Sequence, residues 1–245
     1  MSDISKKRIV ILTNCIIAVM LVSLAIVSFT VDSRTVFNPD SEKPYYQGNT
    51  NVNNVSLMFN VYWGTEYLDG ILNTLDKYGV KATFFVGGTW VEKNGEMLKR
   101  IYNSGHEIGN HGYFHKDHDK LSMTQNRNEI EMTNKIVNEY LGITPKLFAP
   151  PSGAYSNTTL TVAKELNMET IMWSKDTIDW RDKNKSLIYS RATKGVKGGD
   201  LILAHPTQET LSALDSILQY YKDNGFSQVI VGENIKNARN VSMIN

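Results

Sequence analysis

Short apolar segments alternate with longer amphipathic segments along most of this chain, and this alternation constrains the fold more than any other feature. The stretch 66–79, for example, carries leucine and isoleucine at helical spacing and ends in a glycine. Strands interleaved with helices predict an α/β fold with a parallel sheet or an α/β barrel. The predicted strands are residues 55–63, 81–88, 146–150, 169–174, 200–205 and 227–231; the predicted helices are residues 66–79, 90–105, 124–140, 157–166, 186–194 and 208–222.

Polar motifs, some of them rich in glycine or proline, follow several of these strands. They are the histidine-bearing loop 109–118, "APPSG" at 149–153, "DTIDW" at 176–180 and "AHPT" at 204–207. In α/β folds the chemistry collects at the carboxyl ends of the strands. We therefore expect the four motifs to form one site.

The N-terminal segment predicts a membrane anchor. The basic run "KKR" at 6–8 is followed by an uncharged apolar run at 9–29. As a helix this run would be roughly 31 Å long, enough to cross the hydrocarbon core of a bilayer. The basic flank should stay in the cytoplasm as a tail of residues 1–8, which leaves the rest of the chain outside the cell membrane. A cleaved signal peptide, and hence a secreted protein, is the alternative, although the apolar run is long for one and no clear cleavage site follows it.

The remaining chain divides into a linker, one domain and a tail. Residues 30–54 are rich in Ser, Thr, Asn, Asp and Pro, which is typical of a tether; residues 55–237 form the predicted domain and residues 238–245 a C-terminal tail. A net charge of +1 over 245 residues argues against a nucleic-acid partner, which would require a basic face. The only cysteine, Cys15, lies inside the predicted anchor, so the external domain has no disulfide.

The loop "GNHGYFHKDH" at 109–118 is a candidate metal site. His111 and His115 are four positions apart, a spacing that can present two imidazole nitrogens to one divalent ion such as Zn²⁺. Exposed loop histidines without a ligand are the alternative. His118 lies in the charged stretch "KDHDK" and is expected to be a solvated bystander.

Candidate acids, bases and backbone donors follow other strands. His205 comes directly after an apolar strand, where a titratable group can act as acid or base. Asp176 and Asp179 are either two carboxylates turned toward one site or a turn that caps the next helix. "APPSGAY" at 149–155 suits a loop that lends backbone N–H groups to a ligand, because two prolines fix the chain and a glycine frees it; an ordinary rigid turn is the alternative.

Considered in this order, the motifs resemble the polysaccharide deacetylase family, whose domain is also called the NodB-homology or carbohydrate esterase family 4 domain. "ATFFVGG", "GHEIGNHGYFH", "FAPPSGAY", "MWSKDTIDWRD" and "GDLILAHPT" correspond to its successive signatures between about Val55 and Ile235, and the sporulation-associated branch is the most similar. The resemblance implies a distorted (β/α) barrel. It also implies a metal-dependent hydrolase that removes N-acetyl groups from a cell-wall glycan such as peptidoglycan.

The resemblance assigns a role to each matching residue. His111 and His115 would bind the divalent metal, His205 would be the general acid, and Asp179, with Asp176 nearby, would tune that acid. The backbone N–H near Ser152 would stabilise the oxyanion, and Trp180 and Leu203 would line the pocket for the acetyl methyl group. The full set of substrate-binding positions is Asn60, Ser152, Tyr155, Trp180 and Leu203.

The first signature departs from the family pattern. Where the family has T-F-D-D-G, this chain has "LMFNVYWG", with Asn60 in place of the catalytic base and Val61 in place of the third metal ligand. Ala149 replaces the arginine that holds the base. An amide is no general base, and the loss of one costs roughly 10²- to 10⁴-fold in rate. Glu66, in the next helix, is a candidate substitute, although a glutamate there can simply interact with the helix dipole.

Two functions of different classes follow from this pattern. One is a membrane-anchored, metal-dependent deacetylase of cell-wall glycan that uses Glu66 or an unaided metal-bound hydroxide. The other is a catalytically impaired relative that keeps the sugar cleft and acts as a glycan-binding or assembly protein. The persistence of His111, His115, Asp179 and His205 favours the first, whereas the joint loss of base, ligand and arginine favours the second. The sequence alone is interpreted as the deacetylase, with the impaired relative as the alternative.

Overall fold

The computed structural model describes Met20, residues 43–236 and Ala238. The chain divides into two units, Met1–Ser41 and Glu42–Asn245, and all elements named below belong to the second. Apart from Met20, the predicted anchor at 9–29 and the tail before it lie outside the described residues. Among the residues that are described, no helix is both long and apolar enough to span a membrane.

A parallel sheet of eight strands forms the centre of the second unit. Its strand order is β5-β4-β3-β2-β1-β7-β6, and β8 pairs with the start of β1. The strands are β1 (Asn54–Val61), β2 (Thr83–Val86), β3 (Glu107–Asn110), β4 (Leu147–Phe148), β5 (Glu169–Thr170), β6 (Lys175–Asp176), β7 (Leu201–Ala204) and β8 (Ser227–Gln228).

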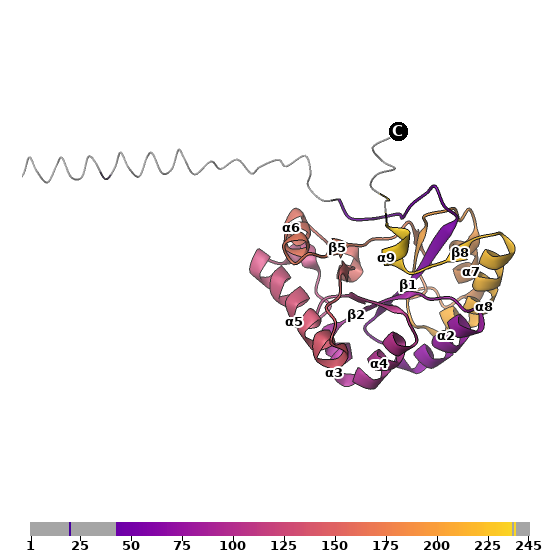
Figure 1. The fold of residues 1–245 in the computed structure, drawn as a ribbon, viewed down its shortest axis with the longest axis horizontal. Coiled ribbons are helices and arrows are strands. Elements are labelled where there is room, and N and C mark those ends of the chain that lie inside the picture. Colours follow the sequence, from indigo (N-terminus) through magenta and orange to yellow (C-terminus); the bar gives the residue numbers. More distant parts are fainter. Residues whose placement is uncertain (1–19, 21–42, 237, 239–245) are drawn as a thin grey trace, which may run out of the picture. The chain divides into compact units, whose positions relative to one another are not determined.

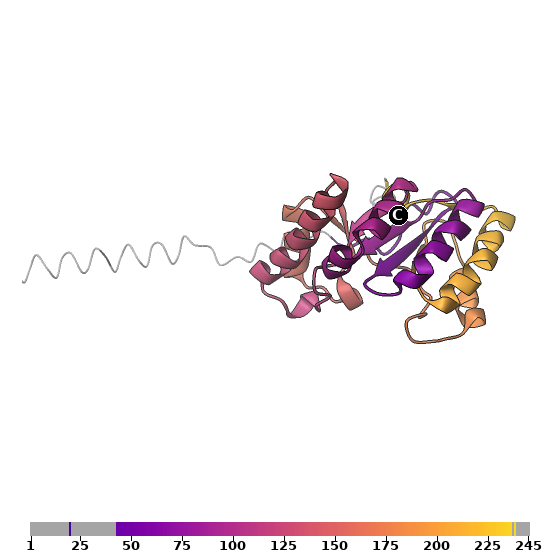
Figure 2. The ribbon, with the colours of Figure 1, turned by 90° about the horizontal axis from the view of Figure 1, so that it is seen from below.

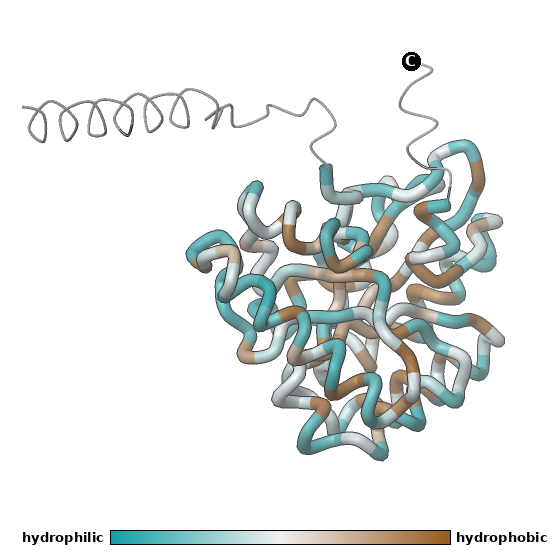
Figure 3. The backbone as a smooth tube through the Cα atoms, turned by 60° about the vertical axis from the view of Figure 1, so that its left-hand side comes forward, coloured by the Kyte–Doolittle hydropathy of each residue, from teal (hydrophilic) through white to brown (hydrophobic). Residues whose placement is uncertain are grey.

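Helices cover the outer face of this sheet (Figure 1). In Figure 1 they follow one another around the strands from α5 through α3, α4 and α2 to α8, and Figure 2 shows α2 beside α8. Hydrophobic and hydrophilic stretches alternate along the backbone, as expected for amphipathic elements (Figure 3). The helices are α2 (Thr65–Lys77), α3 (Gly88–Lys93), α4 (Gly95–Asn103), α5 (Met123–Leu141), α6 (Asn157–Glu165), α7 (Lys185–Thr193), α8 (Gln208–Asp223) and α9 (Val231–Asn234), with the 3-10 turns His118–Lys120 and Pro151–Gly153.

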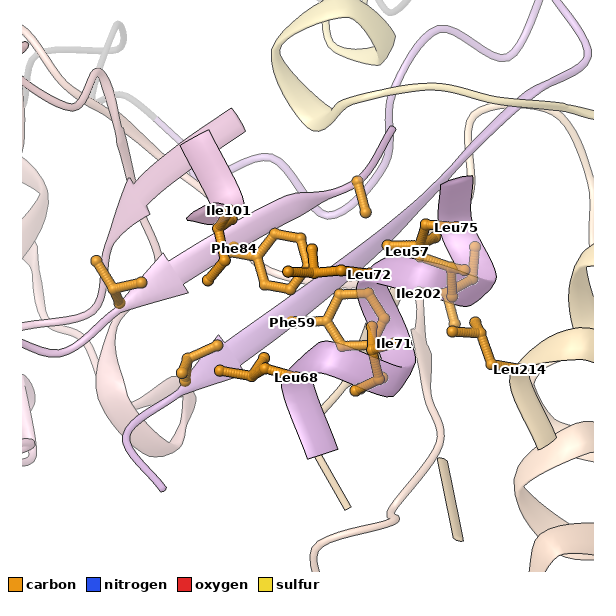
Figure 4. Packing of buried hydrophobic residues seen from close by; sticks show 14 of the residues in the cluster. Leu57, Phe59, Leu68, Ile71, Leu72, Leu75, Phe84, Ile101, Ile202 and Leu214 are labelled. Atoms are coloured by element: carbon orange, nitrogen blue, oxygen red, sulfur yellow. The ribbon is translucent and has the colours of Figure 1, made fainter. Parts of the chain in front are cut away.

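Strand β1 shows how one sequence supplies both faces of the sheet. Leu57, Phe59 and Val61 belong to the large core between sheet and helices, where Leu57 and Phe59 pack against α2 (Figure 4). Met58 belongs to a smaller apolar cluster on the opposite face. Because successive strand residues point to opposite faces, Asn60 shares the face of Met58 and not that of Val61.

The sheet curls into a half-barrel that stays open between its edge strands. No pairing joins β5 to β6 within the described part of the chain. Residues 45–48 bridge the opening instead, because the Tyr45 N–H donates to the Thr170 carbonyl (2.9 Å) and the Gly48 N–H to the Gly199 carbonyl (2.7 Å). The predicted α/β fold with a parallel sheet is confirmed. The resemblance implied a distorted (β/α) barrel, and the described strands form a curled half-barrel that does not close into a full barrel. Residues 43–54, placed in the linker by the sequence, contribute to the fold.

Several predicted elements differ in extent. The single helix predicted at 90–105 is two helices, α3 and α4, because Asn94 has a non-helical backbone and its side chain bonds back to the Trp90 carbonyl. The strand predicted at 169–174 stops at Thr170, and a separate strand, β6, follows. The 227–231 strand ends at Gln228, and Val231 begins α9.

A buried histidine at the amino-terminal rim of the sheet makes stability depend on pH. The His106 side chain is 3% exposed and its Nδ1 accepts the Ala82 N–H (3.1 Å). Burial, reinforced by Lys81, lowers the pKa of His106 from 6.5 to about 4. The unfolded chain therefore binds more protons than the folded chain between these two values, so the contribution of His106 is fully present above the unfolded pKa and is lost as the pH falls toward the folded pKa.

We expect the titration of His106 to lower the free energy of unfolding by about 2 kcal/mol when the pH falls from 7 to 5. The comparison is urea unfolding of the unchanged chain and of His106→Asn, which keeps an acceptor for Ala82 but does not titrate. The variant should lose less stability on acidification by that amount. Equal losses in both chains would show that His106 is not the titrating group.

Candidate functional site

A cavity of about 590 Å³ lies at the carboxyl ends of the strands. It collects side chains from the ends of β1 and β7, from the loops after β3 and β4, and from the segment around β6. The lining residues are Asn60, Tyr62, Trp63, His111, His115, Ser152, Trp173, Asp176, Trp180, Leu203 and His205. The four motifs therefore meet at one edge of the sheet, as the order of strands and loops predicted.

The histidine loop is held by two buried polar residues that the sequence analysis did not identify. Asn110, at the end of β3, donates to the Ile130 carbonyl (2.9 Å) and accepts the Gly112 N–H (2.8 Å). Glu129, on α5 and 3% exposed, accepts the N–H groups of Tyr113 (2.9 Å) and Phe114 (2.7 Å). These bonds anchor the loop to α5 and so fix where its histidines point.

His111 and His115 lie side by side, with ring centroids 5.1 Å apart. His111 is fully buried, and its Nδ1 bonds to the Ala149 carbonyl (2.7 Å). With Nδ1 occupied as a donor, the Nε2 lone pair is left for a ligand, which is the usual arrangement for a metal-binding histidine. Burial is the main cause that lowers the pKa of both His111 and His115, so both rings are neutral near pH 7.

The remaining positions of the family's metal and base set hold groups of other chemistry. Asn60 is 5% exposed, and its Oδ1 has no hydrogen-bond partner in the described structure. Val61 is fully buried in the helix-side core and does not line the cavity. Ala149 is likewise fully buried. The carboxylate expected beside the histidines is therefore replaced by an amide and a core valine.

The donors present do not fit a catalytic zinc ion. Such an ion is usually held by three protein ligands, with one position open for water. In the part of the chain that the structure describes, no group of three or more His, Cys, Asp or Glu could hold a metal ion. Two imidazoles and the Asn60 amide oxygen would make a weaker site than two imidazoles and a carboxylate, because the amide oxygen carries no charge.

His205 is held by a buried carboxylate at the opposite wall of the cavity. Asp179, 2% exposed, accepts the backbone N–H of His205 (2.6 Å) and bonds to its Nδ1 (2.8 Å). The Thr210 hydroxyl, from α8, donates to the same carboxylate. Asp179 lies behind His205 rather than in the cavity wall, as expected for a residue that positions an imidazole.

Two aromatic rings that follow β1 lie against His115 and His205, and neither was among the site residues predicted from the sequence. The Tyr62 ring lies 4.9 Å from the His115 ring, and its hydroxyl accepts a bond from Thr89 (2.7 Å). The Trp63 ring is stacked on His205 at 5.8 Å, with only 4° between the planes. Their position directly after the first strand was the signal that could have placed them in the site. Trp173, inside the quoted motif "MWSKDTIDWRD", was missed as well.

Backbone strain collects in the loops around the cavity. His115, Ser152 and Ile178 have φ values of 55°, 56° and 54°, in the left-handed region that side chains rarely adopt. Each such residue costs on the order of 1 to 3 kcal/mol and persists where the surroundings fix it, often at functional sites. Ile178 also donates its N–H to Asp176 (2.8 Å), whose pKa is nonetheless raised, mainly by burial.

Three sequence predictions have other positions in the structure. Glu66 is exposed in the first turn of α2 and is not among the lining residues. The Tyr155 hydroxyl bonds to the hydroxyl of Tyr46 (2.8 Å), also outside the lining residues. His118 is fully buried and not solvated, and its Nδ1 is hydrogen-bonded to the side chain of Asn126 on α5 (2.6 Å). It does not line the cavity.

The sequence matches the family model described as polysaccharide deacetylase over residues 47–171. It is 40% identical over 191 residues to an uncharacterized protein, YlxY, of Bacillus subtilis; this match covers 78% of this chain but only 60% of that protein. It is 36% identical over 208 residues to a peptidoglycan-N-acetylglucosamine deacetylase of Bacillus cereus, covering 81% of this chain and 76% of the relative.

Among solved structures, the fold is similar to that of a CE4 family pseudoenzyme from Bacillus anthracis, with a TM-score of 0.77 and 36% identity over 79% of this chain and 69% of the pseudoenzyme. A mutant of that pseudoenzyme, described as having restored enzymatic activity, superposes with the same TM-score, at 35% identity over 79% of this chain and 71% of the mutant.

Proposed function

Because this chain belongs to the polysaccharide deacetylase family, we propose that it is a catalytically impaired member that binds cell-wall glycan without turning it over. One observation carries the proposal: the cavity keeps its histidines and aromatic walls, while the base position holds the unpartnered amide of Asn60 and the third-ligand position holds a core valine. A binding protein needs the cavity, whereas a hydrolase also needs the base.

The proposed ligand is a polymer containing N-acetylglucosamine, such as peptidoglycan. Relatives named peptidoglycan deacetylases support this class of ligand. The cavity offers three tryptophans and a tyrosine for the apolar faces of sugar rings, together with Ser152 and Asp176 for hydroxyl groups.

The proposed location is the outer face of the cell membrane, with residues 9–29 as a single-pass anchor. The uncharged apolar run and the basic residues before it support this orientation. The glycan-binding unit would then be held next to the cell wall.

The second candidate is a metal-dependent deacetylase. It is favoured by the His205–Asp179 pair, which is intact at 2.8 Å, and by the free Nε2 of His111. In this alternative a divalent ion such as Zn²⁺ would be held by His111 and His115, and Glu66 would have to move toward the cavity to act as base.

The test measures acetate release and glycan binding on the same preparation. Residues 35–245, which include the whole second unit, are incubated with peptidoglycan and N-acetylglucosamine oligomers, with Zn²⁺, with Co²⁺ or without metal. We expect no release above that of His111→Ala, and saturable oligomer binding by calorimetry. Metal-dependent release that both His111→Ala and Glu66→Gln abolish would instead establish the deacetylase with a relocated base.

A further inference from the structure

Trp63 is an aromatic surface with one face supported and the other face open. Its indole ring is parallel to the His205 ring within 4°, at 5.8 Å between centroids, so one face is backed by the imidazole. The residue is nevertheless 44% exposed, and it lines the cavity. The open face of the indole is therefore available to a ligand.

The support behind Trp63 is rigid. The His205 ring is fixed through Nδ1 and its own backbone N–H to the buried Asp179. Gly64, directly after Trp63, lies in close contact with Pro206, directly after His205. A Cβ on Gly64, whose φ is +77°, would lie 2.0 Å from the Pro206 carbonyl oxygen. Only glycine allows this approach, which places Trp63 next to His205. A platform fixed in this way loses little conformational freedom when a ligand binds.

We propose that Trp63 is the stacking platform for one pyranose ring of the bound glycan, and that His205 serves here as a positioning residue that supports it. This inference rests on the proposed glycan-binding function. The axial C–H groups on one face of a pyranose ring carry partial positive charge, which suits the negative face of an indole ring. Trp180, 55% exposed, lines the same cavity and gives the neighbouring part of the ligand a second aromatic contact.

The first experiment titrates the full-length chain, solubilised in detergent, with N-acetylglucosamine tetramer. Tryptophan fluorescence and calorimetry report binding. Trp63→Ala should weaken the affinity about tenfold, and Trp63→Phe, which keeps a smaller ring, should weaken it less. Tyr102→Ala, an exposed aromatic residue on α4 outside the cavity, is the matched control and should not change the affinity.

A second pair of variants separates ring support from polar contact. His205→Phe keeps a ring under Trp63 but cannot bond to Asp179, whereas His205→Asn keeps a donor for Asp179 but has no ring. The affinity should remain within about twofold in His205→Phe and fall about five- to tenfold in His205→Asn. Thermal unfolding checks that each variant is folded. If His205→Phe does not fold, the affinities of Trp63→Ala and Trp63→Phe still test whether Trp63 is the stacking platform.

Two results would overturn the inference. One is a Trp63→Ala chain that binds the tetramer as well as the unchanged chain does. The other is loss of binding in His205→Phe with retention in His205→Asn, because His205 would then contact the sugar through its polar edge. Failure of the unchanged chain to bind any N-acetylglucosamine oligomer is a separate outcome, which removes the proposed function itself.

Discussion

Replacing Asn60 with Asp, Val61 with Asp and Ala149 with Arg in one chain is expected to create Zn²⁺-dependent acetate release from N-acetylglucosamine oligomers. The increase over the unchanged chain should be at least about 10²-fold, the lower end of what a general base contributes. These substitutions restore the family's base, its third metal ligand and the arginine that holds the base. The remaining requirements, two neutral histidines and a fixed His205, are met by the structure.

The two aspartates should differ in their effect on stability. Asn60 already faces the cavity with an unpartnered oxygen, so Asn60→Asp changes charge and not shape. Val61 lies in the helix-side core, so Val61→Asp buries a carboxylate that only a bound metal or a rearranged strand end can satisfy. The triple variant should therefore melt well below the unchanged chain without metal and recover part of that loss with Zn²⁺, because a ligand of the folded state stabilises it.

The control for this experiment is His111→Ala in the triple background, which should abolish both the acetate release and the Zn²⁺-dependent rise in melting temperature. A triple variant that binds no Zn²⁺ would contradict the expected gain of activity. The Tyr62 ring beside His115, at a position where the family has glycine, would then be the next group to replace.

The order of strands and motifs was enough to predict the parallel sheet and the edge at which the site lies. It could not predict which loop side chains would be buried. His118 shows the reason: the charged stretch "KDHDK" is typical of a solvated loop, but the His118 ring packs against Phe148 of β4, 30 residues away in the chain (5.0 Å between ring centroids), and bonds to Asn126 of α5. Charge patterns describe neighbours in sequence, whereas burial depends on neighbours in the fold.

The role of Tyr62 and Trp63 was hidden for a related reason. Aromatic residues at the end of an apolar strand are usually core residues, and sequence periodicity does not mark where the strand stops. In the structure β1 ends at Val61, so the next two rings leave the sheet and meet His115 and His205. The gap between β5 and β6, bridged by residues 45–48, also depends on long-range contacts that no local pattern encodes.

Asp179→Ala is expected to lower the free energy of unfolding by about 3 to 5 kcal/mol. The carboxylate accepts three donors in a buried position: the N–H and Nδ1 of His205 and the hydroxyl of Thr210. Removing it leaves these donors without an acceptor. A buried donor without an acceptor costs more free energy than one hydrogen bond contributes net to stability. Urea unfolding at pH 7 measures the change.

Two further variants separate the causes of this loss. Asp179→Asn keeps the shape of the side chain but replaces one acceptor oxygen with an NH₂ group that faces another donor. Its free energy of unfolding should therefore lie between that of the unchanged chain and that of Asp179→Ala. Asp215→Ala removes a carboxylate from the exposed ion pair with Lys77 and should change stability little. If Asp179→Ala were no less stable than Asp215→Ala, the buried carboxylate would be dispensable for folding. Its pairing with His205 would then have to be explained by chemistry in the cavity, which would favour the deacetylase over the binding protein.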